Sequence, residues 1–139
     1  MTSSAITKRI MSGVYDAVER AAHQRFERRF RADVRSHDYL RDEGIATGGN
    51  TFYEGTPELA TELMFRRLQM HSDDVFVDLG CGKGSALLLA GEHPINRVIG
   101  VELGDHLAEQ ARRNIAANRG RLRACGFEWS TTTRGSTTS

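Results

Sequence analysis

Two acidic residues flank a run of closely spaced glycines in the middle of the chain. Asp78 lies two residues before Gly80, and Gly82 and Gly84 follow at every second position. Glycine has no Cβ, so its backbone can turn sharply and approach a ligand closely. Glu102 follows about twenty residues after the glycines, where a nucleotide-binding unit places an acid against ribose hydroxyls. The spacing predicts a site for a ligand that carries a ribose.

The position of Asp78 indicates the charge of that ligand. A carboxylate beside the turn repels a polyanion such as a pyrophosphate and attracts a cation such as an ammonium. The dinucleotide fingerprint G-x-G-x-x-G would also require a glycine at position 85, where the chain has Ser85. A ligand with both an ammonium and a ribose is therefore favoured, and an NAD-type dinucleotide is the alternative.

Alternating strands and helices are expected to hold these residues. Val75–Leu79 is a short apolar run typical of a parallel strand buried on both faces. Ser85–Ala90 predicts a helix packed on the sheet, and Arg97–Val101 predicts the second strand. Asp105–Asn118 predicts another helix, and residues 125–129 indicate a third strand. The order predicts an α/β fold with a partial Rossmann-like, doubly wound parallel sheet. The expected apolar side of the second helix consists of Leu107, Ala111, Ile115 and Ala116.

This segment resembles the first motif of the class I (seven-strand) S-adenosylmethionine-dependent methyltransferases, a hydrophobic strand that ends in D-x-G-x-G-x-G. The resemblance implies that S-adenosylmethionine is the cofactor and that the chain is a methyltransferase or its cofactor-binding part. It also implies that Asp78 serves the methionine ammonium or the loop geometry and that Glu102 binds the ribose hydroxyls. The cofactor residues so implied are Asp78, Gly80, Cys81, Gly82, Gly84 and Glu102.

The upstream stretch YEGTPELATELMFRRLQMHSDD extends the resemblance. It is similar to the branch that includes the non-SET histone lysine methyltransferases and their bacterial relatives, in which a Tyr-containing loop closes over the cofactor. This implies Tyr53, Glu54 and Thr56 as further cofactor residues. The stretch also predicts a helix that is capped by Thr56 and begins at Pro57. Its apolar stripe, expected to face the sheet, consists of Leu59, Ala60, Leu63, Met64 and Leu68.

An N-terminal helical extension is predicted before this core. After a polar start of twelve residues that is expected to be mobile, the pattern predicts a helix from Val14 to about Arg35 and a charged loop over Ser36–Asn50. The arginine-rich face of the helix has two interpretations. It is either a basic lid or docking helix for an anionic substrate such as RNA or an acidic protein patch, or a solvated face over a stripe that packs on the core. The stripe consists of Val14, Val18, Ala22, Phe26, Phe30 and Val34.

The end of the chain limits an interpretation as a complete enzyme. In the family the third strand is followed by an acid near the adenine, whereas this chain has Ser130, Thr131 and Thr132. The later strands are absent, so we expect the N-terminal part of a methyltransferase, with its first strand as an open sheet edge. The expected organisation is a helical extension over residues 1–50, a cofactor-binding half-domain over 51–130 and a disordered tail over 131–139.

Composition and the remaining residues narrow the function classes. The net charge of +1 gives no general argument for nucleic acid or membrane. The absence of an apolar run of about 20 residues or of a secretory signal predicts a cytoplasmic protein. The five histidines and two cysteines have no metal-ligand spacing, and no general base can be named. The methyl acceptor stays open among small molecules, proteins and RNA. Besides an oxidoreductase fragment, the other alternative is a non-catalytic fragment that associates with a partner through its open sheet edge and basic helix. Self-association through the open edge is also expected to be possible.

Overall fold

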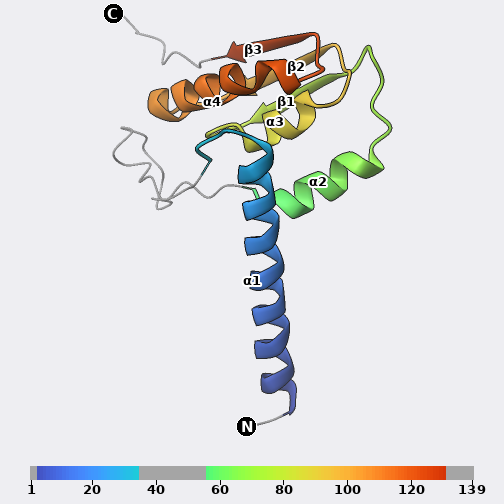
Figure 1. Cartoon of the computed structure of the whole chain (residues 1–139), viewed down its shortest axis with the longest axis vertical. Coiled ribbons are helices and arrows are strands. Elements are labelled where there is room, and N and C mark those ends of the chain that lie inside the picture. Colours follow the sequence, from blue (N-terminus) through green and yellow to red (C-terminus); the bar gives the residue numbers. More distant parts are fainter. Residues whose placement is uncertain (1–2, 35–55, 131–139) are drawn as a thin grey trace, which may run out of the picture.

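A short parallel sheet with helices on one face forms the body of the molecule (Figure 1). The computed structural model describes residues 3–34 and 56–130. The strands lie in the order β1-β2-β3, both neighbouring pairs are parallel, and a helix connects each pair, as the α/β expectation required. The elements are α1 (Ser3–Arg29), α2 (Glu58–Arg67), β1 (Val75–Leu79), α3 (Ser85–Gly91), β2 (Arg97–Val101), α4 (Asp105–Asn118), the 3-10 helix η1 (Arg119–Arg121) and β3 (Gly126–Ser130).

The two faces of the sheet are covered unequally. One face packs on α3 and α4. The chain moves from β1 to β2 and on to β3 in one direction across the sheet, and two right-handed connections of this kind place both helices on the same face. On the other face Val75, Val77 and Leu79 are 47%, 49% and 78% exposed. The prediction that this strand is buried on both faces is therefore wrong. The prediction that it is an open edge is confirmed within the described residues, since β1 pairs with β2 alone.

Helix α1 differs from the predicted helix at both ends. It begins at Ser3, so most of the start expected to be mobile is helical, and it ends at Arg29 rather than near Arg35. The chain leaves the helical path over residues 31–34 because backbone groups of Arg31 and Asp33 pair with side chains of α4. The loop predicted over Ser36–Asn50 lies outside the described residues.

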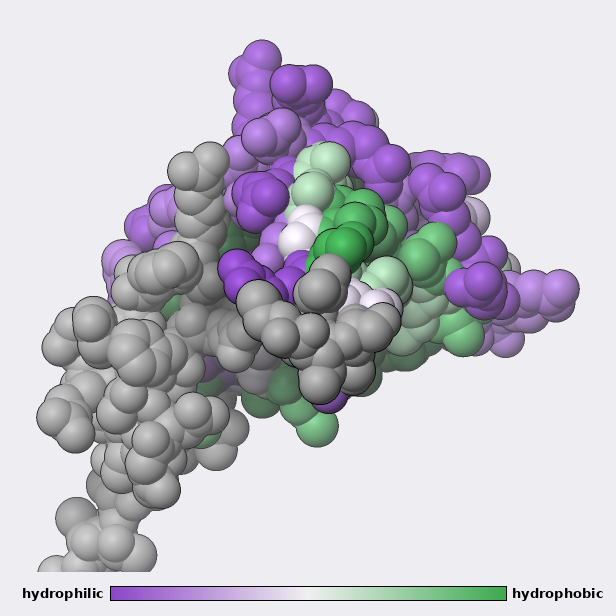
Figure 2. Space-filling model, turned by 90° about the horizontal axis from the view of Figure 1, so that it is seen from below, coloured by the Kyte–Doolittle hydropathy of each residue, from purple (hydrophilic) through white to green (hydrophobic). Residues whose placement is uncertain are grey.

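The apolar stripe of α1 is buried only in its second half. Ala22, Phe26, Phe30 and Val34 are at most 8% exposed, whereas Val14 and Val18 are 54% and 45% exposed. The first half of the helix extends away from the body in Figure 1, and Figure 2, seen from the end where α1 begins, shows hydrophobic surface bordered by hydrophilic surface. For the second half the packing interpretation is confirmed.

Two arginines of that second half form ion pairs across helices. Arg25 and Arg29 both contact Glu62 of α2, and Arg29 also pairs with Glu92 just after α3. Helices α1 and α2 lie outside the layer that α3 forms on the sheet. The ion pairs join α1 to α2 and to the end of α3. The charges of Arg25 and Arg29 are therefore paired within the molecule.

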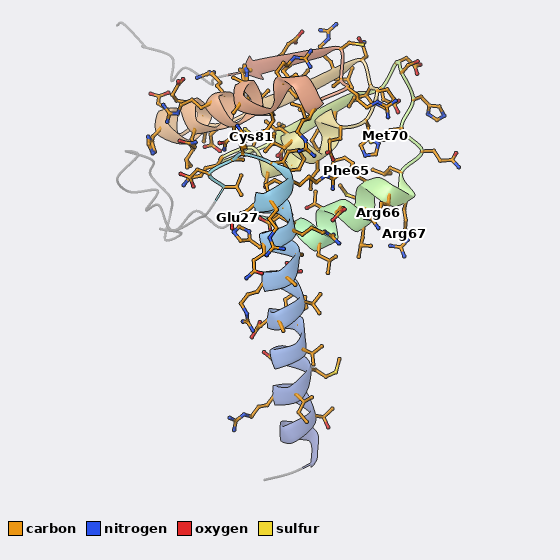
Figure 3. All side chains as sticks on the ribbon, in the orientation of Figure 1. Glu27, Phe65, Arg66, Arg67, Met70 and Cys81 are labelled. Carbon is orange, nitrogen blue, oxygen red and sulfur yellow. The ribbon has the colours of Figure 1, made fainter. Side chains whose placement is uncertain are left out.

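Helix α2 buries a different face from the predicted stripe. Thr56 does not cap it: Pro57 occupies the N-cap position without a side-chain hydrogen bond, and the helix begins one residue later than expected. Thr61 and Phe65 are buried, whereas Leu63, Met64 and Leu68 are 40%, 46% and 50% exposed. The helix packs on α1 and α3, so Phe65 is the apolar side chain of α2 that reaches the core. Figure 3 shows Arg66 and Arg67 on the outer side of the helix.

Phe65→Ala is expected to lower the free energy of unfolding by about 3–5 kcal/mol. The ring is 2% exposed and packs edge-on against Phe76, with 5.2 Å between ring centroids. Urea denaturation followed by circular dichroism measures the loss. The control is Leu63→Ala, at a 40% exposed position, which we expect to change the stability by less than about 1 kcal/mol. Equal losses in the two variants would contradict the observed face.

Candidate cofactor-binding site

The turn between β1 and α3 depends on its three glycines. Gly80, Gly82 and Gly84 have φ angles of 78°, 51° and 86°, a left-handed region that favours glycine. The amides of Gly80 and Cys81 both donate to the carbonyl of Val101, at 2.8 and 3.0 Å. The turn is therefore fastened to the end of β2 while its backbone follows a path that other residues rarely adopt.

The two ends of the turn have different surroundings. A Cβ at Gly80 would meet no described atom within 4 Å, whereas a Cβ at Gly84 would lie 3.2 Å from the Cβ of Ala111. Gly84 therefore allows α4 to pack closely. Gly80 leaves space at the carboxyl end of β1, where a ligand can approach the backbone.

Glu102 organises the turn from the end of β2. Its Oε2 accepts a hydrogen bond from the Gly82 amide at 2.8 Å, and its Oε1 accepts from the amides of Leu103 and Gly104 at 2.8 and 2.9 Å. The residue is 9% exposed, so it is not a solvated strand end. A carboxylate has about four acceptor positions, and three are filled here. Within the described residues, one acceptor position on Oε2 is left for a hydroxyl group.

Asp78 lies at the other side of the same turn. It pairs in register with Gly100, at the end of β1, and is partly buried. Burial raises the pKa of its carboxyl, and the negative charge of Glu102 raises it further. Among the described residues no cation opposes these two effects. The pair of carboxylates makes the turn electronegative, which disfavours a pyrophosphate and favours a cationic group.

Cys81 contributes its backbone rather than its thiol to this site. The side chain is 4% exposed and belongs to the core. Its Sγ lies beside Gly100, 3.0 Å from where a Cβ on that glycine would stand. Figure 3 shows it at the turn, close to the helices. Burial and the charges of Asp78 and Glu102 raise the pKa of the thiol to about 12. The thiol is protonated at neutral pH, which makes it a poor nucleophile.

Sequence reasoning missed Asn114, the polar side chain of α4 that holds the turn. The Nδ2 atom of Asn114 donates to the carbonyl of Lys83, inside the turn, at 2.9 Å. Lys83 is 6% exposed, and its Nζ lies 3.7 Å from Oδ1 of Asp33. The available signal was the position of Asn114 and Asn118, which fall on the helical face of Ala111 where apolar residues are expected. The expected apolar residue Ala116 is instead exposed.

The other predicted site residues are not brought to the turn. Tyr53 and Glu54 lie outside the described residues. Thr56 is exposed just before α2, and no hydrogen bond within the described part of the chain joins it to the turn. Strand β3 ends at Ser130, opposite Val101, so the acid expected near an adenine is missing there.

The described residues contain no group of three or more histidine, cysteine, aspartate or glutamate side chains arranged to hold a metal ion. They also contain no helix long and apolar enough to cross a membrane.

Comparisons with known proteins give a family match and two similar proteins. Residues 38–136 match the family described as "Histone methylation protein DOT1", a match that leaves α1 outside. A protein-lysine N-methyltransferase of Saccharolobus islandicus (strain REY15A) is 33% identical over 67 residues, which cover 48% of this chain and 42% of that protein. The YcgJ protein of Bacillus subtilis, a solved structure, is 20% identical with a TM-score of 0.43 and coverage of 52% of this chain and 30% of its own. The chain thus spans less than half the length of the curated relative it matches.

Proposed function

We propose that this chain, which belongs to the DOT1 family of histone methylation proteins, binds S-adenosylmethionine at the glycine turn and acts in the methylation of protein lysines. The observation that carries the proposal is the placement of Asp78 and Glu102 on either side of a turn made of left-handed glycines. Members of the family use S-adenosylmethionine. The fit of this chain to that cofactor follows from its own residues.

The three parts of the turn suit three parts of the cofactor. Asp78 would attract the methionine ammonium, because its carboxylate is partly buried without a compensating cation among the described residues. The acceptor position on Oε2 of Glu102 that no described residue fills would take a ribose hydroxyl. The space at Gly80 would let the backbone approach the ligand without a side chain in between. The same charges disfavour the pyrophosphate of the NAD-type alternative.

The chain's own residues would bind and orient the cofactor rather than perform proton chemistry. The cofactor supplies a methyl group on a sulfonium, a good leaving group. Alignment of donor and acceptor therefore accounts for much of the catalysis. No described residue is assigned as a base. We infer a lysine of a protein as the acceptor because the relative from Saccharolobus islandicus bears the name protein-lysine N-methyltransferase.

Calorimetric titration of S-adenosylhomocysteine into the full chain, with NAD in parallel, tests the cofactor assignment. We expect heat with S-adenosylhomocysteine alone. Transfer of a labelled methyl group from S-adenosylmethionine to histones, compared with histones whose lysines have been chemically dimethylated beforehand, tests the acceptor class. A folded chain that takes up NAD but not S-adenosylhomocysteine would refute the proposal.

A second candidate function is favoured by the bare face of the sheet. Val75, Val77 and Leu79 present apolar side chains on an edge strand that is open within the described residues. Such an edge is suited to pairing with another strand. The candidate is a non-catalytic role through association of the chain with itself or with a partner. Light scattering of the purified chain distinguishes the two, since a stable monomer that binds S-adenosylhomocysteine supports the methyltransferase.

A further inference from the structure

Two asparagines of α4 fasten the segment that follows α1. Asn118 accepts from the amide of Arg31 and donates to the carbonyl of Arg31, both at 3.2 Å. Asn114 accepts from the amide of Asp33 at 3.1 Å and donates to the carbonyl of Asp33 at 2.9 Å. Each side-chain amide therefore pairs with one residue in the way that a neighbouring strand would. The two asparagines are each 3% exposed.

Only Asn114 also reaches the glycine turn. Its Nδ2 donates a second hydrogen bond to the carbonyl of Lys83, and its Oδ1 accepts a second one from Gln110 at 3.1 Å. A side-chain amide has two donor hydrogens and two acceptor positions, so all four are used. The second donation of Asn118 goes instead to the carbonyl of Asn114 within α4. The two residues thus differ in their contact with the turn.

The carbonyl of Lys83 is a sensitive point of that turn. Lys83 stands between Gly82 and Gly84, and glycine populates left-handed and right-handed backbone regions about equally. The neighbouring peptides therefore resist rotation weakly on their own. Removal of the Asn114 amide would take a hydrogen-bond donor away from this buried carbonyl, which weakens the hold on the present path of the turn and favours other paths.

We infer that Asn114 is a positioning residue for the cofactor: it holds the Lys83 carbonyl, and with it the shape of the turn, and couples the turn to the segment after α1. The inference rests on the proposed function, because the ligand that reports the shape of the turn is S-adenosylhomocysteine. The salt bridge between Lys83 and Asp33 joins the same two segments. Binding at the turn and docking of residues 31–34 should then stabilise each other, since coupling between two sites is reciprocal.

The test compares Asn114→Ala with Asn118→Ala in the full chain by calorimetric titration of S-adenosylhomocysteine. Both substitutions remove an equally buried amide that holds the segment after α1. We expect Asn114→Ala, which frees both the turn and the segment, to raise the Kd about 10-fold, and Asn118→Ala, which loosens the segment but leaves the contact with Lys83 in place, to raise it about 3-fold or less. Circular dichroism melting of both variants shows what fraction is folded at the temperature of the titration.

A second measurement uses the wild-type chain and does not depend on the folding of a variant. Saturation with S-adenosylhomocysteine should slow hydrogen exchange about 5-fold or more at the Asp33 amide, which donates to Asn114. An unchanged rate there would overturn the inference, as would equal Kd values for the two folded alanine variants. A wild-type chain that takes up no S-adenosylhomocysteine would instead refute the proposed function, and this inference with it.

Discussion

Replacement of Asp78 by asparagine should stabilise the ligand-free protein and at the same time weaken S-adenosylhomocysteine binding about 30-fold or more. Burial and the charge of Glu102 raise the pKa of the Asp78 carboxyl in the folded chain. Between the unfolded and folded pKa values the native state binds more protons, so the free energy of unfolding falls as the pH rises. Asparagine has nearly the same shape without the charge. The substitution therefore removes the cost of burying a negative charge near Glu102. It also removes the attraction for the ammonium of the ligand.

Thermal melting and calorimetry of Asp78→Asn give the two quantities. The rise in Tm should be present in full above the raised pKa and vanish below the ordinary pKa of aspartate, about 4. Asp105→Asn is the matched control, because Asp105 is exposed in the first turn of α4 and should leave binding unchanged. A lower Tm at neutral pH, or an unchanged affinity, would show that the carboxylate has a merely structural role.

The turn and the elements around it could be predicted because local rules determine them. The left-handed φ angles at Gly80, Gly82 and Gly84 are what alternate glycines allow, and β2 matches its predicted bounds. The position of Glu102 follows from the length of one strand-helix-strand unit. Its three backbone hydrogen bonds could not be predicted, since they depend on how the chain turns after β2.

The parts that were not predicted depend on partners far away in the sequence. Helix α2 has apolar residues around much of its surface. The side with Phe65 faces inward, where the ring packs in the core and Glu62 also meets arginines of α1. The end of α1 at Arg29 depends on asparagines of α4 more than eighty residues later. Helical periodicity carries no information about such contacts.

Replacement of Glu102 by glutamine should lower both the affinity for S-adenosylhomocysteine, about 100-fold or more, and the Tm. A glutamine keeps one carbonyl oxygen and replaces the other with an NH₂ group. That group would face either the Gly82 amide or the amides of Leu103 and Gly104, so donors would oppose donors. Each buried donor left without an acceptor costs about 1–3 kcal/mol. The turn would lose one of its attachments to the end of β2, and the site would lose the carboxylate that accepts a ribose hydroxyl.

The Tm and the Kd of Glu102→Gln are compared with those of Glu128→Gln, whose carboxylate is 51% exposed and pairs with Arg97 on the surface. We expect the control to change both by little, because exposed ion pairs contribute about 0–1 kcal/mol. If Glu102→Gln kept the wild-type Tm, the three hydrogen bonds would not be what shapes the turn.

The effects of the two acids can thus be separated. Neutralising Asp78 should weaken binding and raise the Tm, whereas neutralising Glu102 should weaken binding and lower the Tm. That opposition follows because no cation among the described residues compensates the burial of Asp78, whereas three amides compensate the burial of Glu102.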